Sequence, residues 1–287
     1  MITVEEFATL QPITVGADVP LKNASAHMKL HHIHHLPVVE NGTLVGMVSA
    51  RDLIGLAPNP SHCRARLDRH EWSPELHSRL RVGDVCTTSV CVAPCETTIH
   101  RAAWLMIQHK IRSLPLVRDE RVVAILTDTD LLHACLNGIP RIKGDDPTEH
   151  WRATPVADFM HRPVLTIDPD SSLANAWMTM RDHEVRHLAV VRGEDNVVGV
   201  VSDDDLFLGM RQSPGGGSDS EPAASPSRLT VADGMTRDVV MIGKYDKLRR
   251  AAETMLAKDI ACLLVMDYCL EGIITRTDLL RAIVTMS

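Results

Sequence analysis

With 287 residues, 45% of them apolar, the chain is long enough for two ordinary domains or several small ones with buried cores. Its formal net charge is −7 and it has no long basic run, which argues against a surface dedicated to nucleic acid or anionic membrane. The apolar runs are short and the start MITVEEFATL lacks a basic stretch and an apolar h-region, so we expect a cytoplasmic protein without a membrane span or secretory signal.

One sequence unit occurs four times, and we number the copies repeat 1 to repeat 4. They span residues 4–57, 82–136, 156–210 and 231–284. Each copy opens with a valine, in the pentapeptides VEEFA, VGDVC, VADFM and VADGM. A short predicted strand follows, with the sequences PITV, VCVA, VLTI and VVMI. Such periodicity indicates that each repeat is one structural unit.

The next element of each repeat is a predicted helix with the pattern L-x2-A-x3-M. Spacings of three and four residues place these side chains on one helix face, so we assign them to the core. The small alanine marks the closest approach of the backbone. The residues are Leu21, Ala24 and Met28; Ile99, Ala102 and Met106; Leu173, Ala176 and Met180; and Leu248, Ala251 and Met255.

Two strands joined by a short turn follow, and a second helix closes each repeat. In repeat 1 these are LPVVENGTLVGMVS and SARDLIGLA, where Asn41-Gly42 is a strong signal for a tight turn. The other repeats differ in loop length by about one residue, where insertions cost least. The predicted order is β-α-β-β-α, which gives an α+β fold class.

Two segments between repeats carry structural signals of their own. Residues 211–230 are rich in glycine, serine and proline, and we expect a flexible linker there. In WSPELHSRL, Ser73 is a plausible helix N-cap and Pro74 suits the first helical position. This pattern predicts a short helix that braces repeats 1 and 2.

These features together resemble the CBS domain family. The matching features are the opening V-x-D-h-M, the strand h-x-x-L-P-V-V and the closing G-h-h-[ST]-x-x-D-L-h, where h is apolar. The resemblance implies that repeats pair through their strands into two CBS-pair modules. It implies that four repeats can form a disc, as in the gamma subunit of the AMP-activated protein kinase, and that adenine nucleotides bind in clefts between paired repeats.

The closing motif supplies a candidate ribose site in every repeat. An ionised aspartate can accept hydrogen bonds from both vicinal hydroxyls of a ribose, and such charge-assisted bonds are the stronger kind. The same spacing is also that of a helix capping box, so folding alone could account for it. The candidate residues are Ser49 and Asp52, Thr127 and Asp130, Ser202 and Asp205, and Thr275 and Asp278.

The histidines of HHIHHL in repeat 1 align with HKIRSL, HEVRHL and KDIACL in the other repeats. The first slot lies near a helix end, where the helix dipole favours a cation, and we interpret it as structural. Later slots alternate between histidine and arginine, which is a good phosphate ligand but a poor metal ligand. Adjacent strand residues also point to opposite faces, which argues against one shared metal. The resemblance implies phosphate binding by His34, His35, Arg112, Arg186 and His187; solvated polar residues at a strand start are the alternative.

The repeats depart from this pattern in ways that bear on binding. Repeat 4 has Ala261 and Cys262 in the basic slots, so its phosphate contribution depends on Arg276. In repeat 3, residues 203–204 place negative charge at a helix N-terminus, whereas Arg51 in repeat 1 places positive charge there. We therefore expect repeats 1 and 3 to be the most competent. Both also keep the first-strand threonine of the family, as Thr14 and Thr166.

The seven cysteines include no CxxC pair and are most simply reduced thiols. The spacing within their one cluster, residues 86–95, fits no common zinc motif, so we expect no metal site. The cysteines are Cys63, Cys86, Cys91, Cys95, Cys135, Cys262 and Cys269.

We expect a regulatory sensor that binds AMP, ADP or ATP and has no catalytic activity. No G-x-S-x-G, Walker or HExxH motif occurs, and the repeats use nearly all of the chain outside the linkers, so the signal must pass to a regulated partner protein. The alternatives are a ligand-free interaction scaffold and, less favoured, a metal or redox sensor. Because histidine loses its charge near neutrality, phosphate affinity should fall as pH rises. We expect neither nucleic acid nor membrane as a partner, and homodimer formation stays open.

Overall fold

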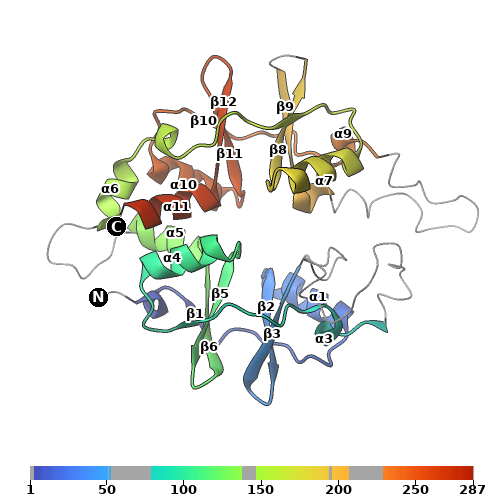
Figure 1. Ribbon diagram of the computed structural model, residues 1–287, viewed down its shortest axis with the longest axis vertical. Coiled ribbons are helices and arrows are strands. Elements are labelled where there is room, and N and C mark those ends of the chain that lie inside the picture. Colours follow the sequence, from blue (N-terminus) through green and yellow to red (C-terminus); the bar gives the residue numbers. More distant parts are fainter. Residues whose placement is uncertain are drawn as a thin grey trace, which may run out of the picture. The chain divides into compact units, whose positions relative to one another are not determined.

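The computed structural model describes residues 3–50, 52, 79–137, 147–193, 196–206 and 229–286. The chain divides into two compact units, which are Met1–Thr148 with Ile283–Ser287, and Glu149–Ala282. Unit 1 contains repeats 1 and 2, and unit 2 contains repeats 3 and 4 except for the last residues of the chain (Figure 1). This division agrees with the predicted pairing of repeats. The predicted disc concerns the arrangement of the two modules and stays a prediction.

Unit 1 is built on one mixed sheet in the strand order β2-β3-β6-β5-β4, with β1 paired to β6. Repeat 1 contributes η1 (Val4–Glu6), β1 (Thr9–Leu10), α1 (Leu21–His31), β2 (His35–Glu40) and β3 (Thr43–Ser49). Repeat 2 contributes α3 (Val82–Val85), β4 (Ala93–Pro94), α4 (Ile99–Gln108), β5 (Ser113–Arg118), β6 (Arg121–Thr127) and α5 (Asp128–Asn137).

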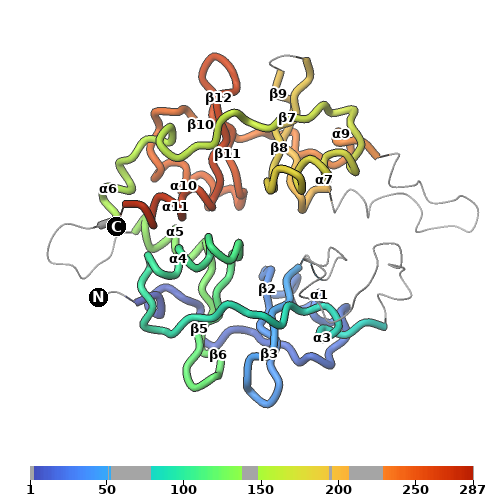
Figure 2. Tube along the Cα trace, viewed as in Figure 1, coloured from blue at the N-terminus to red at the C-terminus, as the bar shows by residue number. Residues whose placement is uncertain are grey.

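Unit 2 contains two three-stranded sheets, β7-β8-β9 and β10-β11-β12, whose hairpins lie side by side in yellow and red (Figure 2). Ala189, Val191, Leu264 and Ile273 form the buried cluster between them. Repeat 3 contributes η3 (Val156–Asp158), β7 (Thr166–Ile167), α7 (Leu173–Asp182), β8 (His187–Arg192) and β9 (Asn196–Ser202). Repeat 4 contributes α9 (Val231–Gly234), β10 (Met241–Ile242), α10 (Leu248–Ala257), β11 (Cys262–Met266), β12 (Leu270–Thr275) and α11 (Arg276–Thr285).

The predicted order of elements is confirmed in full in repeats 2 and 4. In repeats 1 and 3 most of the predicted closing helix lies outside the described residues, as do most of the predicted linker 211–230 and the predicted helix from Ser73. The first strands are shorter than predicted, with two residues each in repeats 2 to 4 and an isolated bridge from Val15 to Val38 in repeat 1. No helix within the described ranges combines the length and the apolar character needed to cross a bilayer.

The local signals in the sequence have the expected structural effect. All twelve residues of the L-x2-A-x3-M pattern are buried, so the stripe on each first helix belongs to the core as predicted. Asn41 and Gly42 both have positive φ, 51° and 84°, which is the backbone of a tight type I′ hairpin turn. Gly42 takes this conformation without the steric cost that a Cβ atom would add.

Each repeat docks its opening valine on the partner repeat of the same unit. The valine N–H donates to the carbonyl two residues before the partner's first helix, and all four valines are fully buried. Because the exchange runs in both directions, neither member of a pair has a complete structure alone. The bonds are Val4 to Thr97 at 2.8 Å, Val82 to Val19 at 2.9 Å, Val156 to Asp246 at 2.8 Å and Val231 to Ser171 at 2.8 Å.

In three of the four openings the fifth residue packs against the glycine of the partner's closing motif. A Cβ atom at Gly199 would lie 2.7 Å from Met235 Sδ and 3.0 Å from the Thr236 carbonyl oxygen, so no larger residue fits without movement. Repeat 2 has Ala124 at this position, and the opening that aligns with it ends in the small Ala8. The same close approach joins Gly272 to Met160 and Gly46 to Cys86.

A helix that the sequence patterns do not predict precedes repeat 3. In α6 (Pro147–Ala153), Trp151 is buried and its Nε1–H donates to the Leu279 carbonyl oxygen on α11 at 3.1 Å. The segment has too little apolar periodicity to signal a packed helix, because one tryptophan supplies most of its buried surface.

We expect Gly199→Ala to lower the free energy of unfolding by about 1–3 kcal/mol, the usual cost of overpacking a filled site. The added methyl group would overlap Met235 Sδ and crowd the Thr236 carbonyl, which is held by a bridge to Val200. Urea unfolding of the full chain measures the change. Adding Met235→Ala, which reproduces the Ala8 and Ala124 combination, should restore part of the loss; strict additivity of the two changes would contradict this contact.

Candidate functional site

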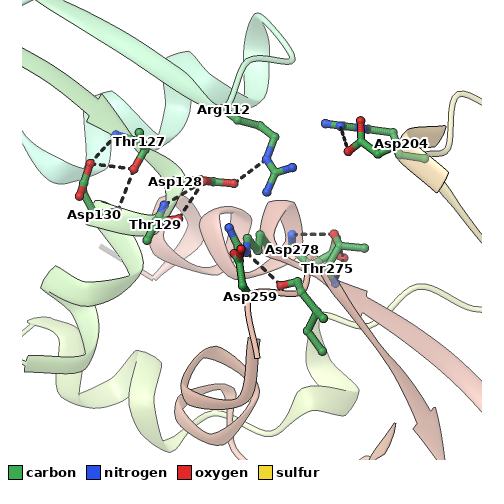
Figure 3. Close-up of polar contacts among 12 residues, drawn as sticks. Arg112, Thr127, Asp128, Thr129, Asp130, Asp204, Asp259, Thr275 and Asp278 are labelled. Atoms are coloured by element: carbon green, nitrogen blue, oxygen red, sulfur yellow. Dashed lines mark hydrogen bonds and ion pairs between the residues drawn. The ribbon is translucent and has the colours of Figure 1, made fainter. Parts of the chain in front are cut away.

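The closing motif has the hydrogen-bond pattern of a helix capping box in all four repeats. Oδ2 of each aspartate accepts one hydrogen bond from the serine or threonine hydroxyl and one from the backbone N–H of the same residue. Figure 3 shows these bonds for Thr127 and Asp130. The aspartate N–H donates back to that hydroxyl oxygen. The folding role weighed against ribose binding is therefore present, and it uses only one carboxylate oxygen. The hydroxyl-to-Oδ2 distance is 2.7 Å in each of the pairs Ser49 and Asp52, Thr127 and Asp130, Ser202 and Asp205, and Thr275 and Asp278.

The second carboxylate oxygen distinguishes the repeats. In Asp130 and Asp205, which are half-buried, Oδ1 has no hydrogen bond to any residue in the described parts of the chain. Burial raises the pKa of Asp130. In Asp278, which is fully buried, Oδ1 lies 2.8 Å from both Arg281 Nη1 and His161 Nε2. A ribose therefore has an acceptor ready at Asp130 and Asp205, but would have to displace side chains at Asp278.

The repeat 3 carboxylate faces repeat 4 across their shared interface. A Cβ atom on Gly234, in the opening of repeat 4, would lie 3.5 Å from the Asp205 carbonyl oxygen. Burial, with a smaller contribution from the Asp205 charge, raises the pKa of Cys262 to about 12. Cys262 therefore brings no charge to the slot where other repeats have histidine, as the sequence predicts for repeat 4.

The second histidine slot lies directly opposite the motif hydroxyl of its own repeat. His35 pairs with Ser49 across β2 and β3, and His187 pairs with Ser202 across β8 and β9. Ser113 and Cys262 occupy the matching positions in repeats 2 and 4. The strand register thus places His35 and His187, two of the phosphate candidates, beside the serines of the candidate ribose pairs.

In repeats 2 and 3 the arginine in the first basic position pairs with the aspartate that directly follows the motif threonine or serine. Arg112 Nε donates to Asp128 Oδ2 at 2.8 Å (Figure 3), and Arg186 Nε donates to Asp203 Oδ2 at 3.1 Å. In both repeats the backbone N–H of the aspartate also donates to the arginine carbonyl, at 3.0 Å. Asp203, which the sequence identifies as unfavourable for an anion, therefore also orients Arg186, and Asp128 orients Arg112 in the same way.

Repeat 4 reverses this arrangement. Arg276 stands where repeats 2 and 3 have the acid, its side chain is largely buried, and its Nε donates to the Ile260 carbonyl oxygen at 3.1 Å. Its Nη2 also donates to Asp259 Oδ1 at 3.2 Å. These bonds brace the turn before β11, which favours a structural role over the predicted phosphate role. In repeat 1, His34 is exposed and Arg51 lies outside the described residues.

The predicted first-strand threonines are both exposed. Thr166 begins β7 and lines a cavity of about 300 Å³ between repeats 3 and 4, opposite Leu270 and Glu271. The residues that line this cavity include neither Ser202 nor Asp205. Thr14 immediately precedes the bridge that Val15 makes to Val38.

The thiols and histidines give little support to a metal or redox site. Burial raises the pKa of both Cys91 and Cys95, which keeps these thiols protonated and poorly nucleophilic. Within the part of the chain that the structure describes, no three or more histidine, cysteine, aspartate or glutamate side chains are arranged to hold a metal ion. Cys63 lies outside that part.

The repeated fold, the exchanged openings and the capped aspartates define a protein of tandem CBS domains. The model of the family described as "CBS domain" matches residues 4–59, 82–137, 156–211 and 230–285. The chain therefore belongs to the CBS domain family.

Two solved structures that cover 98% of the chain share this fold. The chain is 25% identical to protein MJ1225 of Methanocaldococcus jannaschii over 276 residues, which is 94% of each chain. The crystal structure of MJ1225, a proposed archaeal homolog of γ-AMPK, superposes with a TM-score of 0.76 at 23% identity, covering 98% of this chain and 99% of that one. A protein from Pyrococcus horikoshii gives 0.64 at 22% identity, covering 98% and 100%. CBSX2, a CBS protein solved in complex with AMP, gives 0.39 at 29% identity, covering 48% and 98%.

We expect the stability contributed by His161 to depend on pH. The hydrogen bond to Asp278 raises the pKa of His161 above its ordinary value of 6.5. A raised pKa in the folded state contributes stability that is complete below 6.5 and is lost as pH rises through the folded-state pKa. The difference in unfolding free energy between the wild type and His161→Gln should therefore be larger at about pH 5.5 than at about pH 9.

Urea unfolding at both pH values measures that difference. His183→Gln is the matched control, because His183 is an exposed histidine at the end of α7. Equal differences for His161→Gln at the two pH values would contradict the interaction.

Proposed function

We propose that the chain is a regulatory sensor that binds AMP, ADP or ATP at the interfaces between paired CBS repeats, with no catalysis of its own. The observation that carries this proposal is the half-buried carboxylate of Asp205. Ser202 holds its Oδ2, whereas its Oδ1 has no bond to any other described residue. A fixed carboxylate with an available oxygen suits the two vicinal hydroxyls of a ribose.

Basic side chains next to Asp205 support the proposal that the phosphate of the nucleotide contributes to binding. His187 lies opposite Ser202, and Arg186 precedes it with its guanidinium oriented by Asp203. A planar guanidinium is well suited to a phosphate group. Asp203 and Asp204 offset part of that charge, since Arg186 Nη2 also lies 3.9 Å from Asp204 Oδ2. We therefore expect the contact between Arg186 and a phosphate group to add less affinity than it would without these two aspartates.

Asp130 supports a second site in repeat 2 for the same reason as Asp205. AMP is the ligand of the CBS protein CBSX2, but the proposal here depends on the residues of this chain. For a bound nucleotide to act as a signal, it must favour one relative arrangement of two paired repeats over another. We expect a regulated partner protein to receive that signal.

A ligand-free interaction scaffold is the second candidate. The capping bonds would hold all four aspartates in place with no ligand bound, so the motif by itself does not require one. A ligand at about 100 times its dissociation constant stabilises a fold by about 2.7 kcal/mol. A thermal shift with AMP, ADP or ATP favours the sensor, and the absence of a shift with all three favours the scaffold.

We expect Asp205→Asn to weaken AMP binding to the repeat 3 site about tenfold or more, because the charge that strengthens the bonds to ribose is lost. Asparagine keeps the size and an acceptor oxygen, so the helix cap should survive. Calorimetric titration of the full chain with AMP measures the effect.

Asp204→Asn is the matched control for Asp205→Asn. It removes the same charge from an exposed neighbour on the same helix turn, so it should leave AMP affinity unchanged or raise it slightly. Equal affinity in Asp205→Asn and the wild type would refute the ribose role.

We expect Arg186→Gln to weaken AMP binding several-fold while leaving adenosine binding unchanged, because adenosine has no phosphate for the guanidinium to contact. Parallel titrations with the two ligands separate a phosphate contact from a general loss of structure. Asp205→Asn should weaken both ligands alike, since both carry the ribose. Equal weakening of adenosine and AMP in Arg186→Gln would contradict the phosphate role.

A further inference from the structure

Two cationic side chains of unit 2 occupy the Asp278 carboxylate, the counterpart in repeat 4 of the proposed ribose acceptor. His161 Nε2 and Arg281 Nη1 each lie 2.8 Å from Asp278 Oδ1, and they lie 3.0 Å from each other. Thr275 takes Oδ2 through its hydroxyl and its backbone N–H. Both oxygens of this carboxylate are therefore engaged by the protein itself.

The backbone holds His161 in this position. Its N–H donates to the Ile273 carbonyl at 2.8 Å, and the Ile273 N–H donates to the His161 carbonyl at 3.1 Å. The preceding residue is Met160, whose Sδ lies 2.7 Å from the position that a Cβ atom on Gly272 would occupy. The imidazole is thus fixed over the end of β12 and the start of α11.

The other repeats differ from repeat 4 at the two positions that supply these cations. The residue after the opening pentapeptide is a threonine in repeats 1, 2 and 4, namely Thr9, Thr87 and Thr236. In repeat 3 it is a histidine, His161. His161 reaches the carboxylate of repeat 4 because the openings are exchanged within the pair. Arg281 has Leu208 as its counterpart in the sequence of repeat 3.

The protonation state of His161 determines how strongly this carboxylate is occupied. The charged groups that act on the imidazole are Asp278 and Arg281, both on α11. A protonated imidazole donates from Nε2 to Asp278 Oδ1 as a charge-assisted bond. A neutral imidazole has no charge to contribute, and its Nε2 can instead accept from Arg281. Loss of the His161 proton therefore weakens the contact between His161 and Asp278, which competes with a ribose hydroxyl for Oδ1.

We propose that His161 and Arg281 occlude the ribose acceptor of repeat 4, so that this site binds nucleotide weakly and opens as His161 loses its proton. This inference rests on the proposed function, since it assumes that the motif aspartates accept ribose hydroxyls. The affinity of the repeat 4 site for nucleotide then rises with pH. Affinity at a site where charged histidines contact the phosphate falls with pH instead. The raised pKa of His161 places the opening above its ordinary value of 6.5.

Substitutions that copy the sibling repeats test this inference. His161→Thr introduces the residue found at Thr9, Thr87 and Thr236, and Arg281→Leu introduces the residue found at position 208. Equilibrium dialysis of the full chain with AMP at pH 7 counts the occupied sites in the wild type, in His161→Thr and in the double variant. We expect one additional AMP per chain, or at least a tenfold gain in affinity at the weakest site.

Two further measurements assign the gain to Asp278 and to the proton. Asp278→Asn added to the double variant should remove the additional site. The wild type should gain the same site between pH 6 and pH 8.5, whereas His161→Thr should already have it at pH 6. Circular dichroism of each variant without AMP verifies folding, and His161→Thr alone suffices if the double variant is unstable.

The possible outcomes separate this inference from the proposed function. AMP binding that depends on Asp205 but does not increase in His161→Thr or in the double variant overturns the occlusion alone. Weaker AMP binding in these variants also overturns it, because His161 and Arg281 would then be phosphate ligands. No AMP binding by any variant at any pH overturns the occlusion and the proposed function together.

Discussion

The hydrogen bond from the opening valine of each repeat to the loop before its partner's first helix determines which repeats belong together. It occurs four times at 2.8–2.9 Å, always with a fully buried valine. In three of the openings the exchange also carries the fifth residue onto the second strand of the partner's hairpin, where a glycine makes room for it. Each interface between paired repeats, and therefore each candidate ligand site, is assembled by this exchange. His161 contacts Asp278 for the same reason.

The capped aspartates place two demands on one side chain. Oδ2 accepts the capping hydrogen bonds in every repeat, so the residue cannot be lost without cost to folding, typically about 1 kcal/mol for a helix cap. Oδ1 is then the atom through which the repeats can diverge. It is available among the described surroundings of Asp130 and Asp205, and it is bonded to two cations in Asp278. The four motif aspartates can thus differ in how available Oδ1 is to a ligand, while all of them keep the same hydrogen bonds to the motif hydroxyl.

The sequence predicts the features that are set by local pattern, and misses those set by contacts between distant residues. The helix stripes, the Asn41-Gly42 turn and the capping boxes follow from spacing within a few residues, and the structure confirms them. The α6 helix was missed, because a single tryptophan gives no periodic signal. The contact of His161 with Asp278 joins two repeats, and its only trace in the sequence is a histidine where three siblings have threonine.

The exchanged openings also constrain how the chain is made. During synthesis repeat 1 emerges from the ribosome first, but its core lacks the segment that repeat 2 supplies, and repeat 3 likewise waits for repeat 4. Nascent chains that end after an odd-numbered repeat therefore expose an unfilled docking site for a valine. Such a site would accept the opening of another copy, which makes exchange between molecules the characteristic misassembly of this architecture.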